Sequence, residues 1–154
     1  MLKKLENRIP PPAVAIVTGA LMGVMAWLLP PADLPALIQS GIAAVLVVLS
    51  GLFGAPAIAA FRRAGTTINP VRIEKASTLV TGGIYRVTRN PMYVAMTGLL
   101  LALAIFLARP WLLVGPLFFM TYMTRFQIIP EERVMRAKFG ESYADYTRRV
   151  RRWL

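Results

Sequence analysis

The chain has 154 residues, of which 56% are hydrophobic and 16% are charged, and its formal net charge is +11. Charged residues supply about a quarter of an ordinary soluble domain, so this composition excludes that class. The chain has no cysteine and no histidine, which excludes disulfides, thiolate chemistry and imidazole bases and ligands, so we expect no metal.

Four long apolar segments follow one another, and each is long enough to cross a bilayer. They span residues 13–29, 36–61, 91–107 and 111–129, and Arg125 is the only charged residue within them. Such continuous apolar runs exclude the alternating strands of a barrel, whereas helices pair every backbone group in lipid. The sequence therefore predicts an all-α integral membrane protein with four transmembrane helices and a single domain, residues 1–154.

The basic residues are confined to alternate connections between these segments. If the helices alternate in direction, seventeen of the eighteen Lys and Arg residues fall on one side and Arg109 falls on the other. This is the positive-inside pattern, so we expect a multi-pass protein of the inner cell membrane with both termini in the cytoplasm. No aromatic-basic recognition module accompanies the charge, and we expect no nucleic-acid partner.

The first two predicted helices contain small residues that let helices approach closely. Gly19 and Gly23 have the GxxxG spacing, for which ordinary packing within the chain is favoured over dimerisation. Pro56 indicates a possible kink in the second helix.

Residues 62–90 form a long connection on the predicted cytoplasmic side. Its apolar and turn residues, with a bend at Gly82 and Gly83, favour an ordered and functional segment over a disordered one. Asn90 followed by Pro91 is a preferred start for the third helix.

The segment after the fourth helix, residues 130–154, is amphipathic. Its apolar side chains recur at three- and four-residue steps, at Met135, Phe139, Tyr143, Tyr146 and Val150. Gly140 is expected to end one helical piece. The basic run at residues 148–152 suits an anionic leaflet of membrane lipids.

The third and fourth helices form a hairpin that brings two polar clusters to the same membrane edge. The clusters are Arg89–Tyr93 and Pro130–Glu132, and the turn between the helices lies at Arg109. Two adjacent acids near hydrocarbon are costly, although a solvated helix start also accounts for them. The convergence of both clusters at one edge favours a binding site.

These residues together resemble a known family. The run from Leu79 to Tyr93, followed by Glu131-Glu132 and by a tail with Phe139-Gly140 and two spaced tyrosines, resembles the isoprenylcysteine carboxyl methyltransferase family. That family is related to the membrane phospholipid N-methyltransferases. The resemblance extends from about Gly65 to Trp153. It implies a membrane enzyme that uses S-adenosylmethionine at the cytoplasmic edge, releases S-adenosylhomocysteine and methylates a lipophilic small molecule or lipid.

The resemblance also implies roles for individual positions, with the loop and the C-terminal segment completing the cofactor pocket. The implied cofactor-binding residues are Ser77, Thr78, Leu79, Val80, Tyr85, Asn90, Pro91, Met92, Tyr93 and Glu131. The candidate catalytic residues are Glu132, Tyr93 and Arg89. The candidate substrate-binding residues are Arg125 and Gln127.

Two differences from the isoprenylcysteine enzymes leave the acceptor open. Asn90 stands where many isoprenylcysteine enzymes have a histidine, and the sequence that starts at Asn90 resembles the Asn-Pro-Met-Tyr of the phospholipid enzymes. Gln127 stands where those enzymes have an arginine, the cationic partner that suits a prenylcysteine carboxylate. Phospholipid amine N-methylation is therefore an alternative, in which Glu132, Tyr93 or a water would accept the amine proton. A non-catalytic membrane scaffold is the alternative of another class, and the joint presence of the motif residues argues against it.

Overall fold

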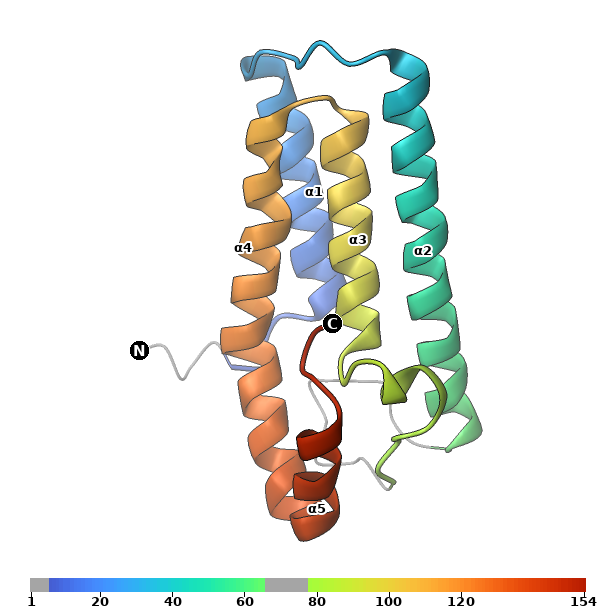
Figure 1. Cartoon of the computed structure of the whole chain (residues 1–154). Coiled ribbons are helices and arrows are strands. Elements are labelled where there is room, and N and C mark those ends of the chain that lie inside the picture. Colours follow the sequence, from blue (N-terminus) through green and yellow to red (C-terminus); the bar gives the residue numbers. More distant parts are fainter. Residues whose placement is uncertain (1–5, 66–77) are drawn as a thin grey trace.

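The computed structural model describes residues 6–65 and 78–154, and these residues form an all-helical structure (Figure 1). Its α-helices are α1 (Pro11–Leu28), α2 (Ala36–Arg63), α3 (Pro91–Phe106), α4 (Val114–Met123) and α5 (Ile129–Arg149). Two short 3₁₀ helices are η3 (Gly83–Arg86) and η4 (Pro110–Leu113), and η5 (Thr124–Ile128) is a π-helical segment between α4 and α5. Ser77, for which a cofactor role is implied, lies outside the described residues.

Three helices of the described chain are long and apolar enough to cross a membrane. They are α1, α2 and the continuous helix that runs from Pro110 to Arg149, so the chain is a multi-pass membrane protein. The helix α3 is also apolar, but its 16 residues make it shorter than the other three. At 1.5 Å per residue it rises about 24 Å. The predicted segments 13–29, 36–61 and 91–107 agree with α1, α2 and α3 to within two residues at each end.

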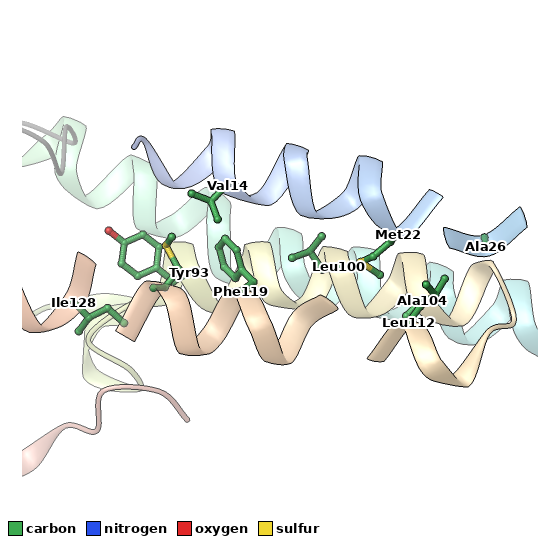
Figure 2. Close-up of a cluster of buried hydrophobic side chains, with 10 residues drawn as sticks. Val14, Met22, Ala26, Tyr93, Leu100, Ala104, Leu112, Phe119 and Ile128 are labelled. Atoms are coloured by element: carbon green, nitrogen blue, oxygen red, sulfur yellow. The ribbon is translucent and has the colours of Figure 1, made fainter. Parts of the chain in front are cut away.

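The helices α1, α3 and α4 share one hydrophobic core. Figure 2 shows side chains of all three helices turned toward one another along the length of the bundle. The buried residues of this cluster are Val14, Met22, Ala26, Tyr93, Leu100, Ala104, Leu112, Phe119, Met123 and Ile128. Gly19 packs against this core, because a Cβ atom added there would lie 3.5 Å from Leu103, whereas nothing lies within 4 Å of Gly23. The expected packing within the chain therefore holds for Gly19.

The helix α2 packs chiefly against α3, at positions where small residues let the two backbones come together. Gly98 of α3 faces the Ser50 side chain, and a Cβ atom added at Gly54 would lie 3.3 Å from the Cβ of Ala95. The rest of α2 exposes a broad apolar surface, which is typical of a helix in lipid rather than in water. Its exposed side chains include Leu37, Ile38, Ile42, Val45, Val48, Leu49 and Leu52. The helix continues through Pro56 to its end at Arg63.

The sequence predicted that the fourth helix ends before Pro130. In the structure the helix instead continues through η5 into α5 (Figure 1). Proline has no backbone N–H, so inside a helix it leaves the carbonyl four residues earlier without its partner. Here that carbonyl belongs to Phe126, and it accepts a hydrogen bond from the backbone amide of Asn7 at 3.0 Å. The π-helical turn just before the proline also relieves the local crowding. The N-terminal segment thus supplies the hydrogen bond that Pro130 cannot donate.

The C-terminal segment folds as its apolar period predicts. Gly140 has φ 52° and ψ −125° and breaks α5 into two pieces, as expected. Tyr143, Tyr146 and Val150 are buried together, with Phe139 packed against them and with Leu79 from the long connection. The second piece of α5 therefore covers the end of the bundle at which α3 begins.

Candidate active site

A cavity of about 210 Å³ lies at this end of the bundle, where α3 begins and α5 leaves η5. Most of the predicted site residues line it: Thr78, Leu79, Val80, Tyr85, Arg89, Asn90, Pro91, Met92, Tyr93, Glu131 and Glu132. Further lining residues were not predicted as site residues: Pro11, Pro12, Phe61, Met96, Ile128, Met135, Tyr143 and Tyr146. The lining residues come from the starts of α1 and α3, the end of α2, the loop with η3, the end of η5, and α5.

Glu131 is held in place by neighbours on two helices. The Tyr93 hydroxyl donates a hydrogen bond to Glu131 Oε1 at 2.8 Å, and Gln127 Nε2 donates to the same oxygen at 2.9 Å. Gln127 is four residues before Glu131, so the two side chains share one face of the helix. Burial raises the pKa of the Glu131 carboxyl above its ordinary value, while the hydrogen bonds from Gln127 and Tyr93 oppose that rise. Both bonds reach Oε1, so Oε2 receives none from the residues that the structure describes.

Glu132, the neighbouring acid, is bound by two arginines. Arg152 donates from Nε to Oε1 at 3.0 Å and from Nη2 to Oε2 at 2.7 Å, which is the bidentate arrangement. Arg89 Nη2 donates to Oε1 at 3.0 Å. Two cations therefore compensate the charge of Glu132, and its side chain joins the start of α3 to the chain after α5.

The turn before α3 is fixed by its own polar groups. Asn90 occupies the N-cap position, as predicted, but its side chain does not cap the helix. Its Nδ2 donates instead to the backbone carbonyl of Arg152 at 2.9 Å, while its own carbonyl accepts from the amides of Tyr93 and Val94. Thr88 is fully buried behind this turn and accepts a hydrogen bond from the Asn90 amide at 3.2 Å. Asn90 thus takes its orientation from the C-terminal segment.

The loop wall of the cavity is attached to both α2 and α5. The Tyr146 hydroxyl donates to the Tyr85 carbonyl at 2.7 Å. The Tyr85 ring also meets Phe61 of α2 edge to face, with ring centroids 5.5 Å apart. Gly83, with φ +60°, makes the bend that leads into η3. These contacts place Tyr85 and the residues before it along the cavity.

The two predicted substrate-side residues lie in different surroundings. Gln127 is only 2% exposed, and its side-chain amide donates a hydrogen bond to Glu131. Arg125 is exposed and pairs with Glu6 at 3.3 Å, and Glu6 also pairs with Arg133 at 3.2 Å. Arg125 is not among the residues that line the cavity. The structure therefore brings Gln127 to Glu131 and does not bring Arg125 to the cavity.

Arg152 is the polar partner that sequence reasoning missed. It lies in a basic run that suggested a membrane-facing surface, and nothing in the sequence marks one arginine of that run as different from the others. Other members of the run are also used within the protein, since Arg148 pairs with Glu141 and Asp145. The guanidinium group of Arg152 is therefore turned toward Glu132 within the protein, whereas Arg148 and its partners are exposed.

Comparison with known proteins places these residues in a family. The family model described as phospholipid methyltransferase matches residues 38–142, which include most of α2, the loop, α3 and both glutamates. A Haemophilus influenzae protein described as uncharacterized is 36% identical over 63 residues, which are 41% of this chain and the whole of that protein. The match gives the broader phospholipid methyltransferase family and does not single out the isoprenylcysteine enzymes within it.

Proposed function

Because this chain belongs to the phospholipid methyltransferase family, we propose that it transfers a methyl group from S-adenosylmethionine to a lipophilic acceptor at the cavity beside Glu131 and Asn90. The observation that carries the proposal is the Glu131 carboxylate, oriented by Tyr93 and Gln127 at the wall of that cavity. A buried, oriented acid beside an apolar cavity is costly unless it binds something.

The residues present fit this cofactor. The aliphatic and aromatic side chains of Leu79, Tyr143 and Tyr146 suit an adenine ring, while a carboxylate suits hydroxyl or cationic groups. Arg89 Nε is buried without a hydrogen-bond partner among the described residues. An unsatisfied buried donor at a cavity wall is typical of a site that a ligand or an ordered water completes.

S-adenosylmethionine, when bound, supplies an electrophilic methyl group, so the protein mainly has to align the reactants. In this proposal Glu131 binds the cofactor, and Tyr93 and Gln127 hold the Glu131 carboxylate in one orientation. Both carboxylate oxygens of Glu132 already accept hydrogen bonds from the guanidinium groups of Arg89 and Arg152. If the acceptor is an amine, its proton passes to Glu131 or to water instead.

The acceptor reaches the cavity sideways from the membrane in this proposal. Pro11 and Pro12 at the start of α1 and Phe61 near the end of α2 line the cavity. The helices α1 and α2 lie on different sides of α3 (Figure 1). In the same proposal α3 is the fourth span, and the cavity faces the cytoplasm because the basic residues gather at this end.

A phospholipid amine is the second candidate acceptor. The family match and the Asn-Pro-Met-Tyr sequence at Asn90 favour it over a prenylcysteine carboxylate. The charge of the site agrees, because Glu131 can neutralise an ammonium group, whereas the cations near the cavity, Arg89 and Arg152, are occupied by Glu132.

Labelled methyl transfer tests the proposal. Purified protein is incubated with methyl-labelled S-adenosylmethionine and a native membrane lipid extract, and the labelled lipids are identified. We expect label in a lipid, with loss of labelling for Glu131→Gln and retention for Glu141→Gln, which makes the same change at an exposed acid. A base-stable labelled headgroup amine indicates the phospholipid acceptor, and a base-labile methyl ester indicates a carboxylate. No labelled lipid from an extract of the source membrane would contradict the proposed reaction.

A further inference from the structure

The segment Val150–Leu154, here called the tail strap, lies behind the polar wall of the cavity. The helix α5 ends at Arg149, and Val150 takes the extended conformation with φ −124° and ψ 132°. The chain then returns from α5 to the start of α3 (Figure 1). Among the strap side chains, Val150 is buried and Trp153 packs against the core of the bundle.

The strap backbone binds the turn that carries Asn90. The Arg89 amide donates to the Arg151 carbonyl at 2.9 Å. The Arg152 carbonyl accepts from Asn90 Nδ2 at 2.9 Å and from the Thr88 hydroxyl at 3.2 Å. The three donors come from consecutive residues, so the turn and the strap fix one another along their length.

Two strap side chains bind other elements. Arg152 forms the bidentate pair with Glu132 at the start of α5, at 3.0 and 2.7 Å. Trp153 Nε1 donates to the Thr124 hydroxyl at the start of η5, at 3.1 Å. The strap therefore connects the turn before α3, the acid pair of α5 and the π-helical segment.

We propose that the tail strap is part of the cofactor site and that Arg152 is its positioning residue. Arg152 orients two cavity-lining residues at once, Glu132 through its guanidinium group and Asn90 through its carbonyl oxygen. A bidentate guanidinium–carboxylate pair sets both the distance and the plane of the carboxylate, which a single ammonium does not do. This inference rests on the proposed function, because it assumes that the cavity binds the methyl donor.

Arg152 also acts on Glu131 through charge. Glu132 is adjacent to Glu131, and its negative charge raises the pKa of the Glu131 carboxyl. Arg152 and Arg89 compensate that charge, so removal of Arg152 lets Glu132 act on Glu131 more strongly. The pKa of Glu131 then rises further, and binding that needs its carboxylate is lost at a higher pH. The other titratable groups that face this region are Tyr93 from α3, Tyr85 from η3, and Tyr143 from α5.

The test is the affinity for S-adenosylhomocysteine, measured by calorimetry across a pH series in detergent. The variants are Arg152→Ala, Arg152→Lys and, as the matched control, Arg149→Ala, which removes the same charge at an exposed position outside the strap. We expect about a tenfold loss of affinity for Arg152→Ala, because a charge-assisted pair to a cavity residue is removed. The midpoint of its pH profile should also move to higher pH. Arg152→Lys should lie between Arg152→Ala and the parent protein, and Arg149→Ala should match the parent protein.

The outcomes separate this inference from the proposed function. If the parent protein binds and Arg152→Ala matches Arg149→Ala in affinity and pH midpoint, the strap is not part of the site. If Arg152→Ala does not fold, Arg152→Lys decides, and a parent-like affinity and midpoint for that variant overturn the inference. If the parent protein itself does not bind S-adenosylhomocysteine, the proposed function fails instead.

Discussion

Arginines hold the chain at both ends of the helix bundle, but their partners differ. At the turn between α3 and η4, Arg109 Nε donates to the carbonyls of Ala26 and Leu29 at 3.1 and 2.6 Å, and its Nη1 donates to the Leu107 carbonyl at 3.0 Å. At the opposite end, Arg89 and Arg152 bind a carboxylate, that of Glu132. At one end the arginine therefore binds backbone carbonyls, and at the other end the arginines bind an acidic side chain.

The difference separates a folding requirement from a functional one. The last carbonyls of a helix have no partner within that helix, and a cation near them is favoured by the helix dipole. Arg109 meets this requirement for α1 and α3. Glu131 and Glu132 lie side by side in the first turn of α5, so their charges repel one another and need compensation. The cavity lies at the end of the bundle where Glu131 and Glu132 are found. We therefore interpret the Arg109 end as structural and the Glu131 end as functional.

The largest expected effect comes from Glu131→Gln. The change keeps the shape of the side chain but removes its charge, and methyl transfer should fall by at least about a hundredfold. The unfolding temperature in detergent should change little, since Gln keeps an acceptor oxygen for Tyr93 and Gln127. Labelled methyl transfer and thermal unfolding measure the two properties, with Glu141→Gln as the control. Methyl transfer at the parent rate by Glu131→Gln would contradict the interpretation of the Glu131 end as functional.

The reverse pattern is expected for Arg109→Ala. Three carbonyls lose their donor, and leaving these partly buried acceptors unsatisfied should lower the free energy of unfolding by about 2–3 kcal/mol. The protein that remains folded should bind S-adenosylhomocysteine with the parent affinity. Thermal unfolding and calorimetry on the same sample check both statements. A loss of affinity without a loss of stability would show that the Arg109 end is not merely structural.

A smaller effect is expected midway between the two ends, at Gly98→Ala. The added methyl group would meet the Ser50 side chain of α2 and should cost about 1–3 kcal/mol of stability. Gly23→Ala is the control, because nothing lies within 4 Å of a Cβ atom added there. The double variant Gly98→Ala with Ser50→Ala should recover much of the loss in thermal unfolding. Equal stabilities of the Gly98 and Gly23 variants would contradict the close packing of α2 on α3.

The smallest expected effect is a pH dependence with opposite signs for binding and for stability. Because burial raises the pKa of Glu131 in the folded protein, the folded state holds this proton more tightly than the unfolded state does. Its contribution to stability is therefore greatest at low pH and is lost as the pH rises through the folded pKa. Affinity for S-adenosylhomocysteine should move the other way and fall as the pH is lowered. A pH series of thermal unfolding and calorimetry detects both trends, and Glu131→Gln should show neither of them.

Much of this arrangement could be predicted from the sequence, because apolar length and period decide where helices form in lipid. The bounds of α1, α2 and α3 follow from runs that lack charges, and the buried face of α5 follows from apolar residues at three- and four-residue steps. The hairpin also correctly places Asn90 and Tyr93 near Glu131. These features depend on local composition and on a single turn.

The features that could not be predicted depend on contacts between distant segments. Pro130 suggested a helix boundary, but an amide from Asn7 satisfies the carbonyl that the proline leaves free. Arg125 was a candidate substrate-binding residue, but it pairs with Glu6 and does not line the cavity. Arg152 could not be distinguished from its neighbours, since only the folded chain shows which arginine reaches Glu132.

The most direct test of the central claim, that the Glu131 end of the bundle binds the methyl donor, is calorimetry of S-adenosylhomocysteine with the parent protein, Glu131→Gln and Arg109→Ala. We predict binding by the parent protein, a strong loss for Glu131→Gln, and parent-like affinity for folded Arg109→Ala. Equal affinity of Glu131→Gln and the parent protein, or no binding by the parent protein, would contradict the claim.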